Sequence, residues 1–238
     1  MAFLNSAVLI WCYMTSWYLI SVSKKRNDIA DIAWGLGFIL VAGFNLILNP
    51  NTKLLISFLL IIIWGTRLSL HIYHRNKNKA EDYRYKQWKN NAYLKVFMTQ
   101  GFFMWLICWP VINSFGNLKW FNSLGILIWI IGFWFESLAD KQLKDFIKNP
   151  KNKGKIMQSG LWAYSRHPNY FGEVTLWWGI FLLNLGNSYW TIIGPLTITF
   201  LITKVSGIPL LEKKYEGNKE FQDYKNKVSP FIPWVQKK

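Results

Sequence analysis

The sequence predicts an all-α integral membrane protein whose single domain is a bundle of about seven transmembrane helices. Of its 238 residues, 52% are hydrophobic and only 17% are charged, which is too apolar for an ordinary soluble domain. The apolar residues also gather in runs long enough to cross a bilayer, which takes about 20 helical residues. The placement of the basic residues, described below, predicts the orientation.

Seven apolar runs are the predicted spans of one domain over residues 1–238. The first is an unlikely signal peptide, because no basic segment precedes it and it is longer than a typical signal-peptide core. The second begins at an acidic residue, the third ends in a basic stripe and the fifth ends in an acidic stripe. The sixth is the shortest and follows Pro168 closely. The runs cover residues 3–22, 30–48, 54–73, 95–115, 120–139, 171–187 and 189–211.

The basic residues fall on every second loop. Segments after the first, third, fifth and seventh runs hold 23 of the 28 basic residues, whereas the alternate loops hold only Lys53 and Lys119. Cytoplasmic loops of membrane proteins carry such an excess, so we expect the N-terminus outside and the C-terminus in the cytoplasm. Orientation and anionic lipid then explain the net charge of +16, and we expect no nucleic-acid partner.

Ionisable residues occur at the predicted cytoplasmic ends of several runs. Such residues are costly in a membrane and usually face a bundle interior or a watery cavity, so their shared depth favours a cavity open to the cytoplasm. The alternative is that these side chains reach the interface as ordinary helix ends do, which explains long Lys and Arg better than short Asp and Glu. The residues are Asp31, Arg67, His71, Glu136, Asp140, Glu173, Lys204 and Glu212.

Two stripes have helical spacing. Arg67, His71, His74 and Arg75 share one face of the third run, and Glu136, Asp140 and Lys144 share one face of the fifth. They are either intrahelical pairs or a site, the first stripe for phosphates and the second for ribose or adenine. Two histidines could also bind a metal, but no third ligand has suitable spacing, so we expect no metal.

The segment SRHPNYFGE, residues 165–173, leads into the sixth run. Proline suits the first turn of a helix, so Arg166 and His167 would lie at the helix N-terminus, with Asn169 and Tyr170 in the first turn. Such an end binds anions. The alternative is a capped structural turn.

Several motifs in order along most of the chain carry a resemblance. The chain resembles a membrane family of unknown function, the DUF1295 type, grouped with the C-terminal domain of steroid 5α-reductases. The motifs are GLWAYSRHPNYFGEVTLWWG (160–179), DIADIAWGLGF (28–38), WGTRLSLHIYHR (64–75), AEDYRY (80–85), FESLADKQLKDF (135–146) and SGIPLLEKKY (206–215).

The resemblance implies an NADPH-dependent reductase acting on an activated C=C bond of an apolar, steroid-, sterol- or isoprenoid-like substrate. Asp140 and Asn169 match nucleotide-contacting positions. By neighbourhood we extend the predicted cofactor site to Arg67, Arg75, Lys144, Tyr164, Arg166, His167 and Lys204.

The resemblance also implies an acid and a tyrosine that polarise the substrate carbonyl. Asp31 is the candidate acid. No tyrosine stands at the expected place in the third run, although Tyr83 or Tyr85 could substitute from the loop. Glu173 is the second catalytic candidate, or it orients Arg166 or Asn169.

A second class competes. The RHPNYFG segment and the tail LLEKKYEGNKEFQDYKNKVSPFIP (210–233) are also similar to isoprenylcysteine and phospholipid methyltransferases. That resemblance implies S-adenosylmethionine held by His167, Tyr170 and Glu212, and a lipid or thiol substrate. In either class we expect membrane lipids and an apolar small molecule as partners. The Lys-, Asn- and Ile-rich composition favours a bacterial inner membrane.

Overall fold

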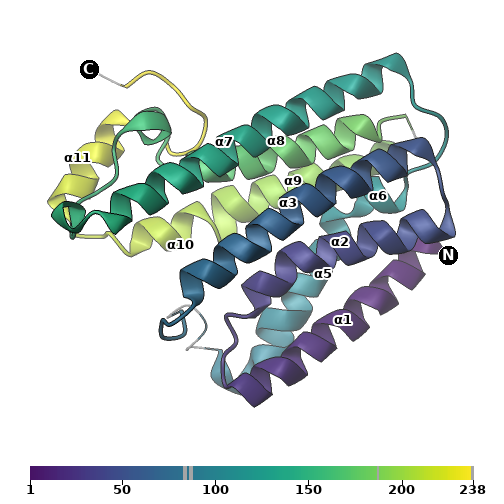
Figure 1. The fold of residues 1–238 in the computed structure, drawn as a ribbon, viewed down its shortest axis with the longest axis horizontal. Coiled ribbons are helices and arrows are strands. Elements are labelled where there is room, and N and C mark those ends of the chain that lie inside the picture. The colour runs from purple at the N-terminus through teal and green to yellow at the C-terminus, as the bar shows by residue number, and fades with distance from the viewer. Residues whose placement is uncertain (83–84, 86–87, 187, 237–238) are drawn as a thin grey trace. The chain divides into compact units, whose positions relative to one another are not determined.

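The chain is helical in the computed structural model, which describes residues 1–82, 85, 88–186 and 188–236 (Figure 1). Within these ranges it forms no strand, apart from a backbone bridge between Ser165 and Ser229. The chain divides into two compact units. Unit 1 comprises Met1–Asn122 and Leu183–Gly194, and unit 2 comprises Ser123–Leu182 and Pro195–Lys238.

Unit 1 is built on three long helices and a broken fourth segment. Helix α1 ends because Lys25 adopts a left-handed conformation (φ 54°) and its N–H bonds back to Val22. Helix α3 begins where the Asn51 side chain accepts a hydrogen bond from the N–H of Leu54. The elements are α1 (Ala2–Lys24), α2 (Ala30–Leu48), α3 (Thr52–Asn76), η1 (Lys89–Asn91), η2 (Tyr93–Met98), α5 (Thr99–Ile107), α6 (Trp109–Ile112), η3 (Trp120–Asn122) and η6 (Tyr189–Ile192).

Small residues and polar bonds join the helices of unit 1. A Cβ on Gly35 would lie 2.6 Å from the carbonyl oxygen of Gly65, so α2 and α3 touch through their backbones. Buried Asn45 donates to Ser6 at 3.0 Å. Close approach at small residues and interhelical hydrogen bonds are typical of membrane helices.

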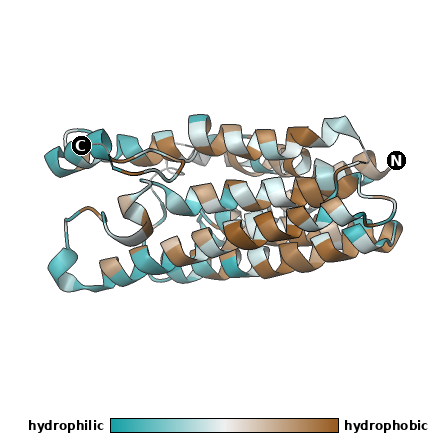
Figure 2. Cartoon of the chain, turned by 90° about the horizontal axis from the view of Figure 1, so that it is seen from above, coloured by the Kyte–Doolittle hydropathy of each residue, from teal (hydrophilic) through white to brown (hydrophobic). Residues whose placement is uncertain are grey.

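Unit 2 contains the longest helix and the C-terminal segments. Helix α11 begins where the Asn218 side chain accepts a hydrogen bond from the N–H of Phe221. The elements are α7 (Ser123–Lys148), η4 (Pro150–Asn152), η5 (Gly160–Ala163), α8 (Pro168–Leu183), α9 (Ile193–Phe200), η7 (Leu201–Val205), α10 (Ile208–Lys213) and α11 (Lys219–Lys227). Figure 2 shows brown, apolar residues along the long helices and mostly teal residues at the C-terminal end.

Two pairs of glycines bring α7 and α8 into backbone contact. A Cβ on Gly172 would lie 2.6 Å from the carbonyl oxygen of Gly132, and one on Gly179 would lie 2.7 Å from that of Gly125. Gly125 and Gly132 are seven residues apart on α7, and Gly172 and Gly179 are seven residues apart on α8. Both contacts therefore fall on one face of each helix. This seam fixes which residues of α7 and α8 face each other.

Five helical segments of the described chain are long and apolar enough to cross a membrane: Ala2–Lys24, Ala30–Leu48, Thr52–Asn76, Trp120–Lys148 and Tyr189–Lys213. They indicate an integral membrane protein. The predicted number of seven is not confirmed, because the fourth run is divided into η2, α5 and α6, and α8 has only 16 residues. The orientation of the termini stays a prediction, as does the single domain.

Candidate functional site

Unit 1 brings together a polar group around Asp31, in the first turn of α2. The Tyr85 hydroxyl donates a hydrogen bond to Oδ1 of Asp31. Gln100, the second residue of α5, extends its Nε2 to within 3.5 Å of the Tyr85 oxygen. Nη2 of Arg75, near the end of α3, lies 4.0 Å from the other Asp31 oxygen. We call Asp31, Tyr85, Gln100 and Arg75 the tyrosine group.

The tyrosine group is partly buried. Tyr85 is 8% exposed and the Asp31 side chain is 19% exposed, whereas the Arg75 side chain is 46% exposed. A phenol bonded to a carboxylate in a poorly hydrated place can donate a proton or a strong hydrogen bond to a developing oxyanion. Of the two tyrosines proposed from sequence, Tyr85 meets Asp31, while Tyr83 lies outside the described residues.

Sequence reasoning missed Gln100. A carboxamide within the apolar run 95–115 was the available signal, since polar groups inside membrane spans tend to be functional. Its Oε1 atom is buried and receives no hydrogen bond from the described part of the chain. Buried acceptors usually have a donor, so this atom leaves a place for a donor from water or from a ligand.

In unit 2, Asp140 and Asn169 meet across the seam between α7 and α8. Nδ2 of Asn169 donates to Oδ1 of Asp140 at 3.1 Å. Gly172, one turn after Asn169, would place a Cβ 2.4 Å from the backbone nitrogen of Glu136, one turn before Asp140. The glycine contact therefore sets the asparagine opposite the carboxylate. We call Asp140 and Asn169 the amide pair.

The amide pair has an unused acceptor. Oδ1 of Asn169 is buried and receives no hydrogen bond from any residue that the structure describes, whereas Asp140 is only 8% exposed. A carboxylate and a free carbonyl acceptor side by side suit a ligand rich in N–H and O–H donors, such as a ribose or an amide. The predicted neighbours Tyr164 and Lys144 are exposed on the same unit.

Arg166 lies among groups of its own chain. Its Nε donates to Oε1 of Glu212 at 2.8 Å, and its Nη1 donates to the carbonyls of Lys225 and Val228 at 3.0 and 2.5 Å. The residue is 6% exposed. Three donors of the guanidinium thus hold the C-terminal segment of unit 2.

His167 completes this arrangement, which we call the arginine anchor (Arg166, His167, Glu212). Its Nε2 lies 3.3 Å from Oε1 of Glu212, and its ring stacks on Tyr170 with centroids 5.7 Å apart. Burial lowers the pKa of His167, and the Arg166 charge adds to this, while the hydrogen bond with Glu212 opposes it. The lowered pKa favours the neutral imidazole, which is a weaker phosphate ligand than the imidazolium cation.

The remaining predicted site residues are dispersed. Arg67 is half-buried on α3, two turns before Arg75, and Glu173 is half-buried in the second turn of α8. Lys204 is exposed in the π-helical segment η7. The structure brings Asp31 close to Arg75, Asp140 to Asn169, and Arg166 to His167.

The fold and these groups define a helical membrane protein with buried ionisable side chains, a combination typical of functional sites in membranes. The chain belongs to the family described as "Protein of unknown function (DUF1295)", whose model matches residues 17–228. This confirms the family predicted from the motifs.

Three named relatives match shorter segments. A steroid 5-alpha-reductase of Gossypium hirsutum is 40% identical over 64 residues, 26% of this chain and 25% of that protein. A 3-oxo-5-alpha-steroid 4-dehydrogenase of Rattus norvegicus is 26% identical over 113 residues, 47% of this chain and 40% of that protein. A probable O-methyltransferase of Ustilaginoidea virens is 42% identical over 55 residues, 23% of this chain and 19% of that protein.

The matched segments span well under half the length of these three relatives. All three organisms are eukaryotes, so the comparisons lend no support to the predicted bacterial inner membrane.

Proposed function

We propose that this protein is a membrane reductase that uses NADPH to reduce an activated C=C bond in a steroid-, sterol- or isoprenoid-like substrate. The observation that carries the proposal is the hydrogen bond from the Tyr85 phenol to Asp31. The relatives named as a steroid 5-alpha-reductase and a 3-oxo-5-alpha-steroid 4-dehydrogenase support the reaction class. The apolar helices favour a substrate that partitions into the bilayer.

The tyrosine group receives the carbonyl of the substrate. Reducing a C=C bond conjugated to a carbonyl builds negative charge on the carbonyl oxygen, and a hydrogen-bond donor aimed at that oxygen stabilises the transition state. Tyr85 is this donor: its one O–H hydrogen, which Asp31 accepts in the structure, turns to the carbonyl oxygen when the substrate binds. Tyr85 is buried and the Asp31 side chain is only 19% exposed, which strengthens the interaction, because little water screens it.

The amide pair holds the nucleotide. The unused Oδ1 acceptor of Asn169 and the buried Asp140 carboxylate fit the hydroxyl and amide donors of NADPH. When bound, NADPH supplies the hydride. The exposed cations Lys144 and Lys204 of unit 2 are the proposed partners of its phosphates, with Tyr164, Arg166 and His167 of that unit retained as further members of the cofactor site. The cofactor roles of Arg67 and Arg75, in unit 1, stay predictions from the sequence.

Ligand-dependent stability tests the proposal on detergent-purified protein. NADPH, NADH and S-adenosylmethionine are titrated while the melting temperature is followed, because a ligand that binds the folded state raises its stability. We expect stabilisation by NADPH, and its loss in Asn169→Leu. Stabilisation by S-adenosylmethionine alone would replace the reductase with a methyltransferase.

Measurements of turnover distinguish the role of the tyrosine group from that of the amide pair. With NADPH and an enone steroid, absorbance at the nicotinamide band reports hydride transfer. We expect Tyr85→Phe and Asp31→Asn to lower kcat by at least about 100-fold, as loss of an oxyanion donor does, and to keep the stabilisation by NADPH. Wild-type turnover in Tyr85→Phe would remove the proposed role of the tyrosine.

Glu212 cannot serve as the control position whose substitution leaves binding and turnover unchanged. It accepts the Nε hydrogen bond of Arg166 at 2.8 Å, so any change at Glu212 also disturbs Arg166. Lys155, which is exposed on the loop after η4, is the better control, and Lys155→Gln should leave binding and turnover unchanged.

A further inference from the structure

The loop that carries Tyr85 is fastened to the segment between α1 and α2. Arg26 makes two hydrogen bonds to Asp28, Nε to Oδ1 at 3.0 Å and Nη2 to Oδ2 at 2.7 Å. Its third donor, Nη1, reaches the carbonyl of Lys79 at 2.9 Å. Arg26 thus uses the bidentate geometry that makes arginine–carboxylate pairs directional. Its remaining group, Nη1, donates to the backbone of Lys79, in the loop that carries Tyr85.

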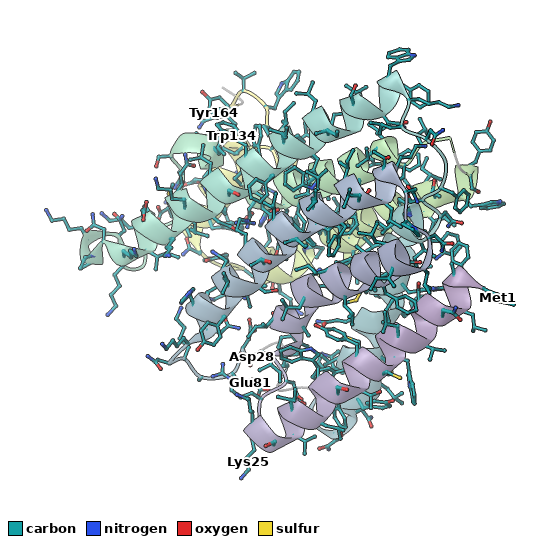
Figure 3. All side chains as sticks on the ribbon, turned by 45° about the vertical axis from the view of Figure 1, so that its right-hand side comes forward. Met1, Lys25, Asp28, Glu81, Trp134 and Tyr164 are labelled. Atoms are coloured by element: carbon teal, nitrogen blue, oxygen red, sulfur yellow. The ribbon has the colours of Figure 1, made fainter. Side chains whose placement is uncertain are left out.

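Two further bonds join the same segments. The backbone N–H of Asn27 donates to Oε1 of Glu81 at 2.6 Å. The backbone N–H of Asp82 donates to Oδ2 of Asp28 at 3.4 Å. Figure 3 shows Asp28 and Glu81 close together beside the end of α1, which Lys25 marks. We call Arg26, Asp28 and Glu81 the clasp.

Short chains of hydrogen bonds connect the clasp to both Tyr85 and Asp31. The N–H of Tyr85 bonds to the carbonyl of Asp82 at 3.0 Å, so Tyr85 is tied directly to Asp82. On the other side, the N–H of Asp31 bonds to the carbonyl of Asp28 at 3.3 Å. Asp28 therefore bonds to Asp82, which holds Tyr85, and to Asp31 in the first turn of α2.

The burial of Asp28 indicates that the clasp is more than an ordinary surface ion pair. Asp28 is 2% exposed, and a buried carboxylate is costly unless it is paired and hydrogen-bonded. An ordinary surface loop needs no such group, because exposed ion pairs contribute little stability. The charge-assisted bonds of Asp28 hold in one place a loop that contains the candidate proton donor.

We propose that Arg26, Asp28 and Glu81 are positioning residues that hold the Tyr85 hydroxyl against Asp31. This proposal rests on the proposed function for its catalytic meaning. Its structural content, that the clasp keeps Tyr85 at Asp31, stands without substrate or nucleotide. Opening the clasp releases Tyr85 to solvent while the helices of unit 1 remain folded.

Nitration of tyrosines by tetranitromethane, mapped by mass spectrometry, tests the clasp on the full chain in detergent. Tyr85 is 8% exposed and Tyr224, in unit 2, is 3% exposed, so both react slowly in the wild type and Tyr224 is an internal reference. We expect Asp28→Asn to raise the nitration rate of Tyr85 about tenfold, the effect of losing a hydrogen bond to a charged group. Asp31→Asn, which removes the other carboxylate charge, is the positive control.

Lys79→Gln is the matched control, because Lys79 contributes its backbone carbonyl to the clasp and its side chain is exposed. We expect wild-type nitration in that variant. If Asp28→Asn fails to fold, Arg26→Gln is tested in its place, because the Arg26 side chain is 30% exposed and tolerates substitution more readily. In the double variant Arg26→Gln, Asp28→Asn, Tyr85 should be nitrated no faster than in either single variant, because both substitutions break the same ion pair.

An unchanged Tyr85 rate in a folded clasp variant overturns the clasp and leaves the proposed reductase standing. A tenfold response in a protein that NADPH does not stabilise overturns the reductase and leaves the clasp. In an active protein, the clasp variants should lower kcat for the enone while the concentration of NADPH at half-saturation stays within about twofold, as expected when a transition-state contact is lost.

Discussion

At the scale of single residues, Arg166 combines burial with three hydrogen bonds inside its own unit. Arg166→Met should lower the free energy of unfolding by about 3–5 kcal/mol, because it leaves Glu212 without its main partner. Denaturant unfolding in detergent measures this loss. Lys225→Ala should cost no more than about 1 kcal/mol, since the Lys225 side chain is 46% exposed and contacts Glu212 only at 3.4 Å. Equal losses in the two variants would contradict the arginine anchor.

His167 gives the protein a pH dependence of known sign. Its pKa is lowered in the folded state by burial, so the unfolded chain binds the proton more tightly. Stability should therefore be complete above about pH 6.5, the ordinary value, and should fall as the pH drops from there through the lowered pKa. His167→Gln should flatten this slope in melting curves taken from pH 8 to pH 5. His74→Gln, at an exposed position of α3, should keep it.

Residues of the two proposed groups were predictable to different degrees. Asp31 and Asp140 are acids at the ends of apolar runs, and their cost in a membrane marks them in the sequence. The role of Glu212 in binding Arg166 was not predictable, because it depends on a contact between residues 46 positions apart. Gln100 was visible as a polar residue in an apolar run, but its partner Tyr85 reaches it from a loop.

At the scale of elements, the seam between α7 and α8 is the most constrained contact. Gly172→Ala should destabilise the protein by about 1–3 kcal/mol, because the new Cβ would lie 2.4 Å from the nitrogen of Glu136 and backbone cannot move aside as a side chain can. Thermal unfolding in detergent measures the change. The effect should extend to the amide pair, so NADPH stabilisation should fall as well.

Gly43→Ala is the control for this seam. Its Cβ would meet the ring edge of Phe58 at 3.0 Å, which a small ring movement relieves. If Gly43→Ala lowered the stability as much as Gly172→Ala, glycine replacement would be costly in any apolar helix of this protein. The seam between α7 and α8 would then not be specially constrained.

The limits of the helices were predictable where hydropathy alone sets them. The predicted span 30–48 coincides with α2. Helix α7 runs nine residues past the predicted end at 139, because Leu143 and Phe146 pack on a cluster with Met157 and Trp162 that hydropathy does not register. The fourth run breaks after Ile107, where Pro110 removes a backbone donor.

At the scale of the whole molecule, the alternation of basic loops predicts the orientation. Lys119→Cys and Lys153→Cys, introduced separately after replacement of Cys12 and Cys108, place one thiol in each class of loop. A membrane-impermeant maleimide should label Lys119→Cys in intact cells and Lys153→Cys only after permeabilisation. The reverse pattern would invert the topology and place the basic loops outside.

The order of synthesis leaves the arginine anchor incomplete until late in translation. Arg166 emerges from the ribosome long before its acceptors, which lie 46, 59 and 62 residues later. Helices α8 to α10 are therefore made while this guanidinium still lacks two of its three acceptors, the carbonyls of Lys225 and Val228. A chain stalled before residue 225 therefore carries an incompletely paired arginine just before α8.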